Sequence, residues 1–402
     1  MQLLRNPLVQ PLEEPFRAVI DDLARARRWP TSREPSRLGQ LVGELSRAYN
    51  DSSAMRSPPP RTEDALAARL LFSFARDVPK GAGAVRELVS TGALSFSAGR
   101  ALRVLDLGAG LGATTRGIAR ALAASGAEGV VQIDAIDSDA SALGLAAAIV
   151  RARPEEGSVR IEMVTREGSV RSAVADGPYD LVVLGQVLSE LDVGDEGVGR
   201  TAKHAALVER YAAPLDAAGA VVIVEPALRD RTRHLHAVRD LLLERGVGLN
   251  VFAPCVHDGM CPMLPKSESW CHEDLDVDLP DWLAPVARAA GLRWQGLTFS
   301  YLVLRRDGRR LVPAAVASAM RVVSSPVVTK GKRELFLCGE VTGPGDLAAR
   351  TAPLRVMRLD RHRAPSNALW DEAARGDVLE LTPPVLPERP RVSSETTVRR
   401  LT

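Results

Sequence analysis

The sequence predicts an α/β protein with a mostly parallel sheet, an N-terminal helical region and a small C-terminal β-rich domain. Three observations lead to this fold class. Strand-like and helix-like segments alternate over residues 101–304, helical periodicity fills the first hundred residues, and short β-rich pieces follow residue 305. Because parallel strands need long crossover connections, this alternation indicates a sheet covered by helices on both faces. Ligand sites are then expected beyond the carboxyl ends of the strands.

The N-terminal region, residues 1–100, is predicted to be helical. The stretches LGQLVGELSRAYN and TEDALAARLLFSFARDV carry apolar residues three and four positions apart, which is the period of an amphipathic helix. The segment between them contains three consecutive prolines and cannot continue a helix, because proline removes a backbone donor and restricts φ. Thr62 is expected to start the second helix, since two acidic residues follow it directly.

Residues 101–304 are predicted to form the main sheet domain, in which strands such as ALRVLDLG and GAVVIVEPAL alternate with helices such as ATTRGIARALAAS. A cysteine-rich insertion is expected at about residues 250–275. Residues 305–380 are expected to form a basic β-rich domain, in which glycine and proline separate short strands. The tail from 381 to 402 is expected to be disordered because it is rich in proline, serine and charge.

Composition bounds the class of protein. The chain has 402 residues, 46% hydrophobic and 25% charged, which is ordinary for a soluble globular protein of two or three domains. No apolar run reaches the roughly 20 residues that span a bilayer, and proline and acid interrupt the start where a signal peptide would be apolar. We therefore expect a cytoplasmic protein with no membrane partner. In that compartment thiols stay reduced, so metal binding explains clustered cysteines better than a disulfide.

The net charge of +2 is unevenly distributed. Lys+Arg against Asp+Glu number 15 to 11 over residues 1–100, 19 to 28 over 101–300, and 18 to 11 over 301–402. Basic ends on an acidic middle indicate a polyanion partner, with a solvated basic surface as the alternative.

The first strand of the main domain ends in VLDLGAGLG, a D-x-G-x-G-x-G pattern. Glycines let the backbone turn sharply and approach a ligand without a Cβ in the way, and the next helix offers free N–H groups. This spacing is typical of Rossmann-like class I methyltransferases, which bind S-adenosylmethionine. An acid ending the second strand would accept the ribose hydroxyls, and one after the third strand would lie near the adenine. The candidate cofactor residues are Asp106, Gly108, Gly110, Gly112, Asp137 and Glu167. The alternative is a glycine-rich turn without a ligand.

The sequence identifies no catalytic residue. The Asn/Asp-Pro-Pro-aromatic turn of amino-group methyltransferases is missing, because residues 185–188 read GQVL. No cysteine nucleophile for carbon-5 methylation of pyrimidines lies near the ends of the fourth and fifth strands. Glu225, at the end of the fifth strand, could position a substrate or be a solvated cap. The histidines on predicted helices are expected to be surface or core residues: His204, His234 and His236.

Three of the four cysteines lie within seventeen positions, in the pattern C-x5-C-x9-C, and the fourth follows after 66 more residues. Four thiolates suit tetrahedral zinc or a [4Fe–4S] cluster. Structural zinc usually takes ligands two to four residues apart, so these longer gaps favour the cluster. His257 and His272 flank two of the cysteines and keep a Cys₃His zinc site as an alternative. Four unrelated buried thiols are a second alternative.

The stretches PCVHDGMCPM, WCHEDL, FSYLVL and ELFLC follow the sheet motif in this order. With them, the chain resembles the methyltransferase-like family associated with the mitochondrial small ribosomal subunit, which has bacterial homologues, over about residues 40–345. The resemblance implies a [4Fe–4S] cluster on Cys255, Cys261, Cys271 and Cys338. It also implies contact with rRNA of the small ribosomal subunit, a role in assembly or translation, and no DNA partner. Methylation of rRNA is an activity that the resemblance leaves open.

The stretch RVVSSPVVTKGKREL, just before Cys338, carries its basic residues ahead of its first acid. Such a patch can bind phosphates without reading bases. The candidate RNA-binding residues are Arg321, Lys330, Lys332 and Arg333. A solvated basic loop is the alternative.

Three functions therefore compete. The first is a small-subunit RNA-associated protein with a methyltransferase fold and an iron–sulfur cluster. The second is a small-molecule or protein methyltransferase with structural zinc. The third is a binding module without either cofactor.

Overall fold

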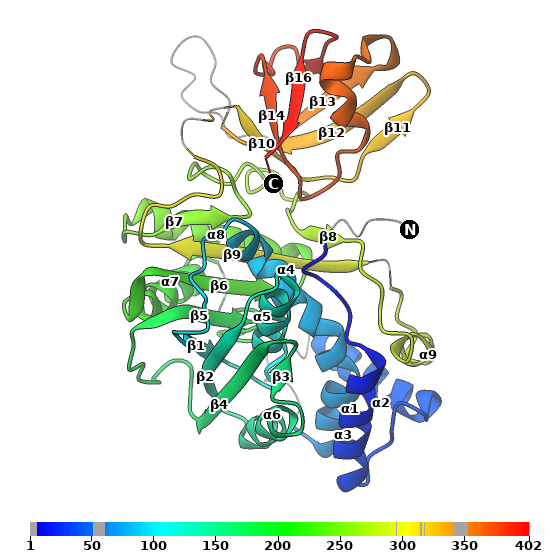
Figure 1. The fold of residues 1–402 in the computed structure, drawn as a ribbon, viewed down its shortest axis with the longest axis vertical. Helices are drawn as coiled ribbons and strands as arrows, with labels where there is room; N and C mark the ends of the chain where they lie inside the picture. The colour runs from blue at the N-terminus through cyan, green and yellow to red at the C-terminus, as the bar shows by residue number, and fades with distance from the viewer. Residues whose placement is uncertain are drawn as a thin grey trace. The chain divides into compact units, whose positions relative to one another are not determined.

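The computed structural model describes residues 6–50, 61–195, 197–294, 296–313, 316, 318–340 and 353–401 (Figure 1). The chain divides into two compact units, which we call the first and the second unit. The first comprises Met1–Glu225 with Asp276–Leu297, and the second comprises Pro226–Leu275 with Thr298–Thr402. Among the described residues, no helix is both long and apolar enough to cross a membrane.

The first unit is built on a sheet with the strand order β3-β4-β2-β1-β5-β6. Neighbouring strands pair in parallel, except that β3 pairs antiparallel with β4. Strand β5 is buried along almost its whole length, as expected for a parallel strand covered on both faces. The predicted α/β Rossmann-like fold is therefore confirmed. The strands are β1 (Leu102–Leu107), β2 (Gly129–Asp137), β3 (Glu155–Glu156), β4 (Val159–Glu167), β5 (Tyr179–Gly185) and β6 (Leu215–Glu225).

Helices precede the sheet and also connect its strands. The N-terminal helices are α1 (Glu14–Ala26), α2 (Pro35–Asn50), α3 (Glu63–Ala68), the π-helical η2 (Arg69–Phe74) and α4 (Ala75–Ser90). The connecting helices are α5 (Ala113–Ala124), α6 (Ala140–Ala152) and α7 (Val198–Ala212), and α9 (Leu283–Ala289) also belongs to this unit. Thr62 caps α3 as predicted, because its hydroxyl accepts the N–H of Ala65 at 3.2 Å.

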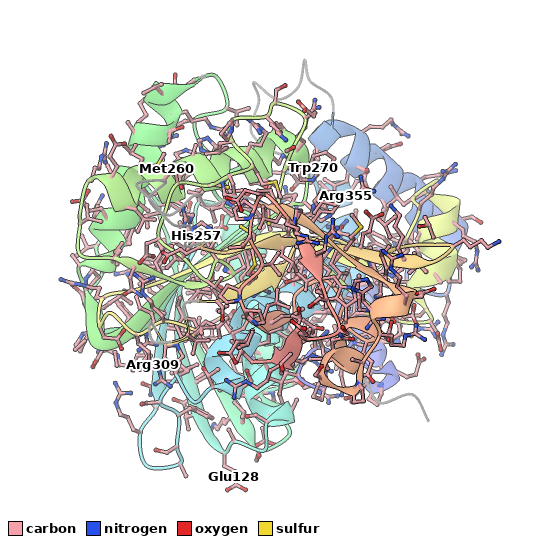
Figure 2. All side chains as sticks on the ribbon, turned by 90° about the horizontal axis from the view of Figure 1, so that it is seen from above. Glu128, His257, Met260, Trp270, Arg309 and Arg355 are labelled. Carbon is pink, nitrogen blue, oxygen red and sulfur yellow. The ribbon has the colours of Figure 1, made fainter. Side chains whose placement is uncertain are left out.

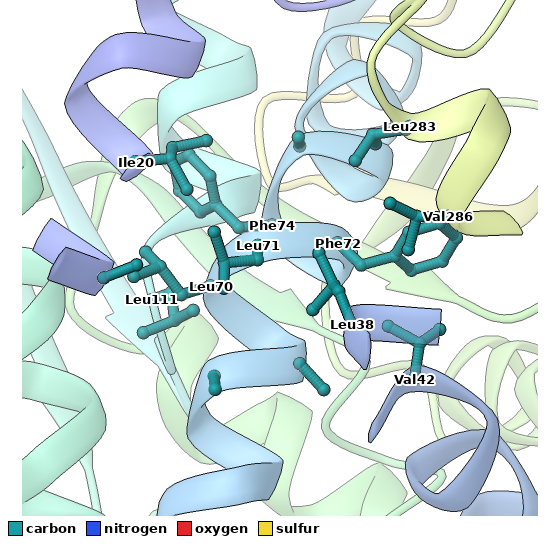
Figure 3. Close-up of a cluster of buried hydrophobic side chains, with 14 of the residues drawn as sticks. Ile20, Leu38, Val42, Leu70, Leu71, Phe72, Phe74, Leu111, Leu283 and Val286 are labelled. Carbon is teal, nitrogen blue, oxygen red and sulfur yellow. The ribbon is translucent and has the colours of Figure 1, made fainter. Parts of the chain in front are cut away.

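The N-terminal helices share one apolar core with the turn that follows β1. Phe74 of η2 and Leu38 of α2 lie in the same buried cluster as Leu111 of that turn, and α9 adds Leu283 and Val286 (Figure 3). Each buried side chain of this size stabilises the folded protein by about 1.5–3 kcal/mol. The helical region is therefore part of the first unit's core and covers the turn.

The second unit contains helix α8 (Arg229–Glu244), a small set of strands and a curled antiparallel sheet. Strand β9 (Leu297–Arg305) pairs with β7 (Asn250–Ala253) and with β8 (Glu273–Leu275). The curled sheet has the order β15-β13-β12-β10-β14-β16, with β11 paired to β12, and its core surrounds Trp370. Its strands are β10 (Ala319–Val322), β11 (Val327–Thr329), β12 (Lys332–Cys338), β13 (Leu354–Leu359), β14 (Val378–Thr382), β15 (Arg391–Val392) and β16 (Thr397–Arg400).

The prediction that residues 381–402 are disordered is wrong for the part of that tail that the structure describes. Strand β16 pairs antiparallel with β14, from Leu379 opposite Arg400 to Thr382 opposite Thr397. Val398 is buried against the core of the curled sheet. The composition of the tail is polar because most of its side chains face outward, while its backbone completes the sheet. The other domain boundaries stay predictions.

Helices α4 and α5 touch through their backbones at two glycines. A Cβ on Gly81 of α4 would lie 2.1 Å from the carbonyl oxygen of Thr114. A Cβ on Gly117 of α5 would lie 2.0 Å from the carbonyl oxygen of Val78. Neither position leaves room for a side chain, because the atoms it would meet are backbone. This contact therefore sets the distance between the N-terminal helices and the helix that begins after the turn.

Replacing Gly117 by Ala should destabilise the protein by about 1–3 kcal/mol, because a methyl group forced into this contact must push two helices apart. The matched control is Gly144→Ala in α6, where an added Cβ would meet no atom within 4 Å. That change should stabilise the helix by up to about 1 kcal/mol. Urea unfolding of both variants measures the difference. Equal unfolding midpoints would contradict the assigned close contact.

Candidate cofactor and metal sites

The glycine-rich turn joins β1 to α5 in a backbone conformation that glycine adopts easily. Gly108, Gly110 and Gly112 have φ values of 67°, 51° and 74°, in the left-handed region. Among the residues that the structure describes, a Cβ on Gly110 would meet no atom within 4 Å, whereas one on Gly108 would meet Val187 at 2.6 Å. Gly110 therefore faces open space, and Gly108 allows the loop after β5 to pack against the turn.

Asp137 ends β2 and holds the turn in place. One carboxylate oxygen accepts the N–H of Gly110 and the other accepts the N–H of Asp139, each at 2.8 Å. Each oxygen keeps a further lone pair that a ribose hydroxyl could use. Glu167 lies opposite Asp137 in the pairing of β2 with β4 and is exposed. The acids predicted to contact the cofactor therefore lie at the carboxyl ends of neighbouring strands.

Asp106, at the end of β1, is buried beneath the turn with 1% of its surface exposed. Its carboxylate accepts the hydroxyl of Thr115 at 3.1 Å. Burial raises the pKa of Asp106 to about 7, although the Thr115 hydrogen bond lowers it, and Asp137 raises it as well. Its carboxyl is therefore partly protonated near neutral pH and can act as either donor or acceptor.

Side chains from the N-terminal helical region reach the same edge of the sheet, which sequence patterns do not predict. Arg61 donates to the carbonyl and to the hydroxyl of Ser138, each at 2.8 Å. Arg69 lies 3.5 Å from Asp139 and donates to the hydroxyl of Tyr49 at 3.3 Å. Burial raises the pKa of Tyr49 to about 12. These contacts fasten the segment that follows Asp137.

Glu225 caps the loop that follows β5. It is buried, and its two carboxylate oxygens accept the N–H groups of Leu188 at 2.8 Å and Ser189 at 3.2 Å. The solvated cap that the sequence suggested is therefore wrong, because Glu225 is buried and caps the loop after β5. A role in positioning a substrate stays a prediction.

A buried ion cluster lies beside this loop. Arg76 and Lys80 each contact Asp77 at 2.8 Å, and the side-chain amide of Gln186 donates to Asp77 at 3.2 Å. Burial raises the pKa of Asp77, but Arg76 and Lys80 lower it more, so it falls well below its usual range. A carboxylate held this firmly in its charged form is a weak proton acceptor, and we assign it no catalytic role.

The four cysteines all belong to the second unit. Cys255 follows β7, Cys261 lies in the next loop, Cys271 precedes β8 and Cys338 ends β12. Burial raises the pKa of the Cys338 thiol well above its usual value, and the thiols of Cys255, Cys271 and Cys261 raise it further. Burial, followed by Cys255, raises the pKa of Cys261 to about 12. The four predicted ligands therefore lie close enough together for the other three to raise the pKa of Cys338.

The donor set suits a cluster held by cysteines. Burial and the neighbouring cysteines raise the pKa values of Cys261, Cys271 and Cys338, and a bound cation would offset the repulsion between their thiolates. Three buried nitrogen atoms have no hydrogen-bond partner among the residues that the structure describes: Nδ1 of His236, Nδ1 of His272 and Nε of Arg375. These residues line a small pocket together with Cys271. Buried polar atoms normally have a partner, so hydrogen-bonding capacity is unused beside this thiol. Among the described residues, no three His, Cys, Asp or Glu side chains form a site for a single metal ion. The iron–sulfur assignment stays a prediction.

Helix α8 binds the backbone of residues 254–272, which we call the cysteine stretch. Arg233, His236 and Arg239 are three residues apart and Asp240 is adjacent, so the four lie on one face of the helix. Arg233 donates to the carbonyls of Met263, Leu264, Lys266 and Ser269 at 2.6 to 2.9 Å. His236 Nε2 lies 3.2 Å from the carbonyl of Cys271, Arg239 donates to the carbonyls of His257 at 2.7 Å and Gly259 at 2.8 Å, and Asp240 accepts the N–H of Cys261 at 2.9 Å.

Sequence reasoning placed His236 as a core or surface residue and did not single out its neighbours on α8. The available signal was a polar row at three-residue spacing on a helix that precedes the cysteines. Side chains of the cysteine stretch differ in their surroundings. His257 is buried, and its Nε2 lies 3.5 Å from the sulfur of Cys338. Met260 is 62% exposed and Trp270 is 39% exposed; Figure 2 labels all three residues.

Arg321 does not belong to an RNA-binding surface, so that prediction is wrong. The side chain is buried, with 4% of its surface exposed. Its guanidinium donates to Glu273 at 2.7 Å, to the hydroxyl of Tyr301 at 3.0 Å and to the carbonyl of Pro254 at 3.2 Å. It therefore joins β10 to β8 and to the start of the cysteine stretch.

The remaining basic candidates lie on and beside strand β12. Lys330 is exposed in the turn between β11 and β12, and Lys332 is partly exposed beside Glu334 at 3.0 Å. Arg333 points to the other face of the strand and donates to the carbonyl of Ala373 at 2.9 Å. The hairpin thus presents two lysines, while Arg333 has a structural contact.

The chain was compared with family models and with curated proteins. A family model described as mitochondrial small ribosomal subunit Rsm22 matches residues 78–348. No curated protein matches the chain.

Three solved methyltransferases are among the structures that match the chain at low identity. One from Leishmania major, described as SAM-dependent, is 15% identical, with coverage of 71% of this chain and 91% of that one and a TM-score of 0.34. A putative RNA methyltransferase from Pyrococcus horikoshii is 12% identical, with coverage of 56% and 83% and a TM-score of 0.31. The plantazolicin methyltransferase BpumL, solved with SAH, is 10% identical, with coverage of 68% and 98% and a TM-score of 0.34. Because these TM-scores are low, the fold assignment rests on the strand order of the chain itself.

The family match spans about two thirds of the chain, and it includes both the glycine-rich turn and all four cysteines. This chain therefore belongs to the family of the mitochondrial small ribosomal subunit protein Rsm22.

Proposed function

We propose that this protein associates with the small ribosomal subunit, binds its rRNA, and acts in subunit assembly or translation while holding S-adenosylmethionine and a [4Fe–4S] cluster. The observation that carries the proposal is a single family match that includes both the glycine-rich turn and the four cysteines. Methylation of rRNA is not part of the proposal, because we assign a catalytic role to none of the described residues. The expected cytoplasmic location stays a prediction.

Cys255, Cys261, Cys271 and Cys338 would hold the cluster. When bound, it would supply a redox-active centre and covalent links between the end of β12 and the cysteine stretch. Two buried guanidinium groups support an anionic centre here. Arg239 lowers the pKa values of Cys261 and Cys338 against the effect of burial, and Arg321 does so for Cys271. A structural zinc ion in a small-molecule or protein methyltransferase is the alternative.

Protein purified without oxygen should contain about four iron and four sulfide atoms per chain. Cys255→Ser and Cys338→Ser should lower the iron content by similar amounts, although 83 positions separate them in the sequence. Ser267→Ala, an exposed change within the cysteine stretch, is the control and should leave iron unchanged. Metal analysis that finds stoichiometric zinc and no iron would remove the cluster from the proposal and favour the zinc alternative.

The open face of Gly110 and the acids around it support binding of S-adenosylmethionine. A ligand above the turn would meet backbone without a Cβ, the N-terminus of α5, and the carboxylates of Asp137 and Glu167. Asp137 would bind with one lone pair of each oxygen, since the others accept N–H groups of the protein.

Gly110→Arg should weaken binding of S-adenosylmethionine at least about a hundredfold, because the side chain fills the space above the turn. The control is Gly126→Arg, where φ is also positive and the surroundings are also open, but the position is remote from the turn. It carries the same backbone strain and should bind as the wild type does. Isothermal calorimetry measures both. No heat with the wild type would eliminate the cofactor from the proposal.

The hairpin of β11 and β12 supports contact with RNA. Lys330 is exposed at its turn, and Lys332 lies two positions along. Lysines at the tip of a hairpin can reach phosphates, and such contacts carry little base information.

Replacing Lys330 and Lys332 together with Ala should lower the slope of log affinity against log salt by about one to two, because each phosphate contact releases counterions. Arg333 is left intact because it holds Ala373. The control removes two cations from the first unit, Arg160→Ala with Lys203→Ala. Filter binding to small-subunit rRNA across a salt series makes the comparison. If the lysine variant and the control kept the same slope as the wild type, the hairpin would be a solvated surface.

A further inference from the structure

We infer that one face of helix α8 is a template that gives the cysteine stretch its shape before any cluster is bound. The inference deepens the proposed cluster site and rests on it only for the identity of the metal. Arg233, His236, Arg239 and Asp240 are the positioning residues, and none of them is a proposed ligand.

The need for a template follows from the backbone. Between β7 and β8 the cysteine stretch forms turns and irregular structure, so its carbonyl groups have no ladder of partners. Polar backbone groups that leave water without a partner are costly. The guanidinium of Arg233 is shared among four carbonyls, three of which lie around the two hydrogens of Nη1, and that of Arg239 donates to two more. Planar guanidinium groups suit this task because their donors point in fixed directions.

The contacts lie between the thiols, so they set the distances along the stretch. Arg239 binds carbonyls between Cys255 and Cys261, and Arg233 binds carbonyls between Cys261 and Cys271. The remaining contacts lie at the cysteines themselves. Asp240 accepts the N–H of Cys261, and His236 contacts the carbonyl of Cys271. No step in this arrangement requires a metal.

The buried charge of the template is compensated within it. Arg239 is fully buried and pairs directly with Asp240, which is 3% exposed, so the helix delivers no uncompensated charge to the interior. A carbonyl only accepts hydrogen bonds, so Nε2 of His236 carries the proton that it shares with Cys271.

Hydrogen–deuterium exchange of the full chain tests the template in the metal-free protein. The wild type should protect the peptides that contain the amides of Cys261, Leu264 and Ser269, which are hydrogen-bonded in the structure. Arg233→Gln should speed their exchange about tenfold or more, because charged hydrogen bonds to several carbonyls are lost together. Arg229→Gln, an exposed change on the same helix, is the control and should leave exchange unchanged.

A second pair of variants separates shape from charge. Arg239→Gln should speed exchange around Cys261, whereas Arg239→Lys keeps the charge and should restore part of the protection. Because Arg239 is buried, its variants are compared with the wild type only if their global unfolding midpoints are the same. If they fail to fold, Arg233→Gln provides the test. In anaerobic reconstitution followed by visible absorbance, Arg233→Gln should take up the cluster at least about tenfold more slowly than the wild type.

The exchange and uptake measurements test the template and the cluster separately. If the metal-free wild type exchanges as fast as an unstructured peptide over the cysteine stretch, the template is overturned, because the cluster would then impose the shape. Equal exchange and equal uptake in wild type, Arg233→Gln and Arg229→Gln would overturn it as well. A wild type that is protected but takes up no iron would support the template and remove the proposed cluster instead.

Discussion

Backbone carbonyl groups that leave water must find donors, and in the cysteine stretch most of those donors come from the side chains of one helix. The arrangement depends on two arginines of α8 whose guanidinium groups serve carbonyls that no strand or helix could serve. Arg321 of β10 adds a further donor, to the carbonyl of Pro254 at the start of the stretch. Cys255, Cys261 and Cys271 of the stretch all act on the pKa of Cys338 at the end of β12.

Beside the glycine-rich turn, the carboxylate of Asp137 has one observed and one proposed role. Asp137 would contact a cofactor, yet both of its oxygens already accept N–H groups of the protein. The same carboxylate therefore holds the turn in place, and in the proposed cofactor site it would offer its remaining lone pairs to the ligand. Preorganisation of this kind lowers the ordering cost of binding. The N-terminal helical region contributes through Arg61 and Arg69, which hold the two residues after Asp137 from outside the sheet.

Local patterns predicted the α/β fold, the glycine-rich turn and the helix start at Thr62, because each depends on neighbours in the chain. They failed where the outcome depends on distant partners. Arg321 sits in a basic stretch, but its partner Glu273 is 48 positions away and comes next to it only through the fold. The tail looked disordered by composition, yet β16 is held by backbone pairing with β14, which composition does not reveal. The role of α8 is invisible in sequence because its partners are carbonyls, and every residue type carries one.

The two glycines that join α4 and α5 have a mechanical consequence. Where side chains separate two helices, rotamer changes let the helices slide, but at Gly81 and Gly117 backbone meets backbone and there is nothing to rearrange. Helix α4 and the first turn of α5 are therefore expected to move together as one rigid body. A displacement of α4 would be transmitted to the residues directly after Gly112, and in the other direction a ligand that orders the glycine-rich turn would stiffen helices that it never touches.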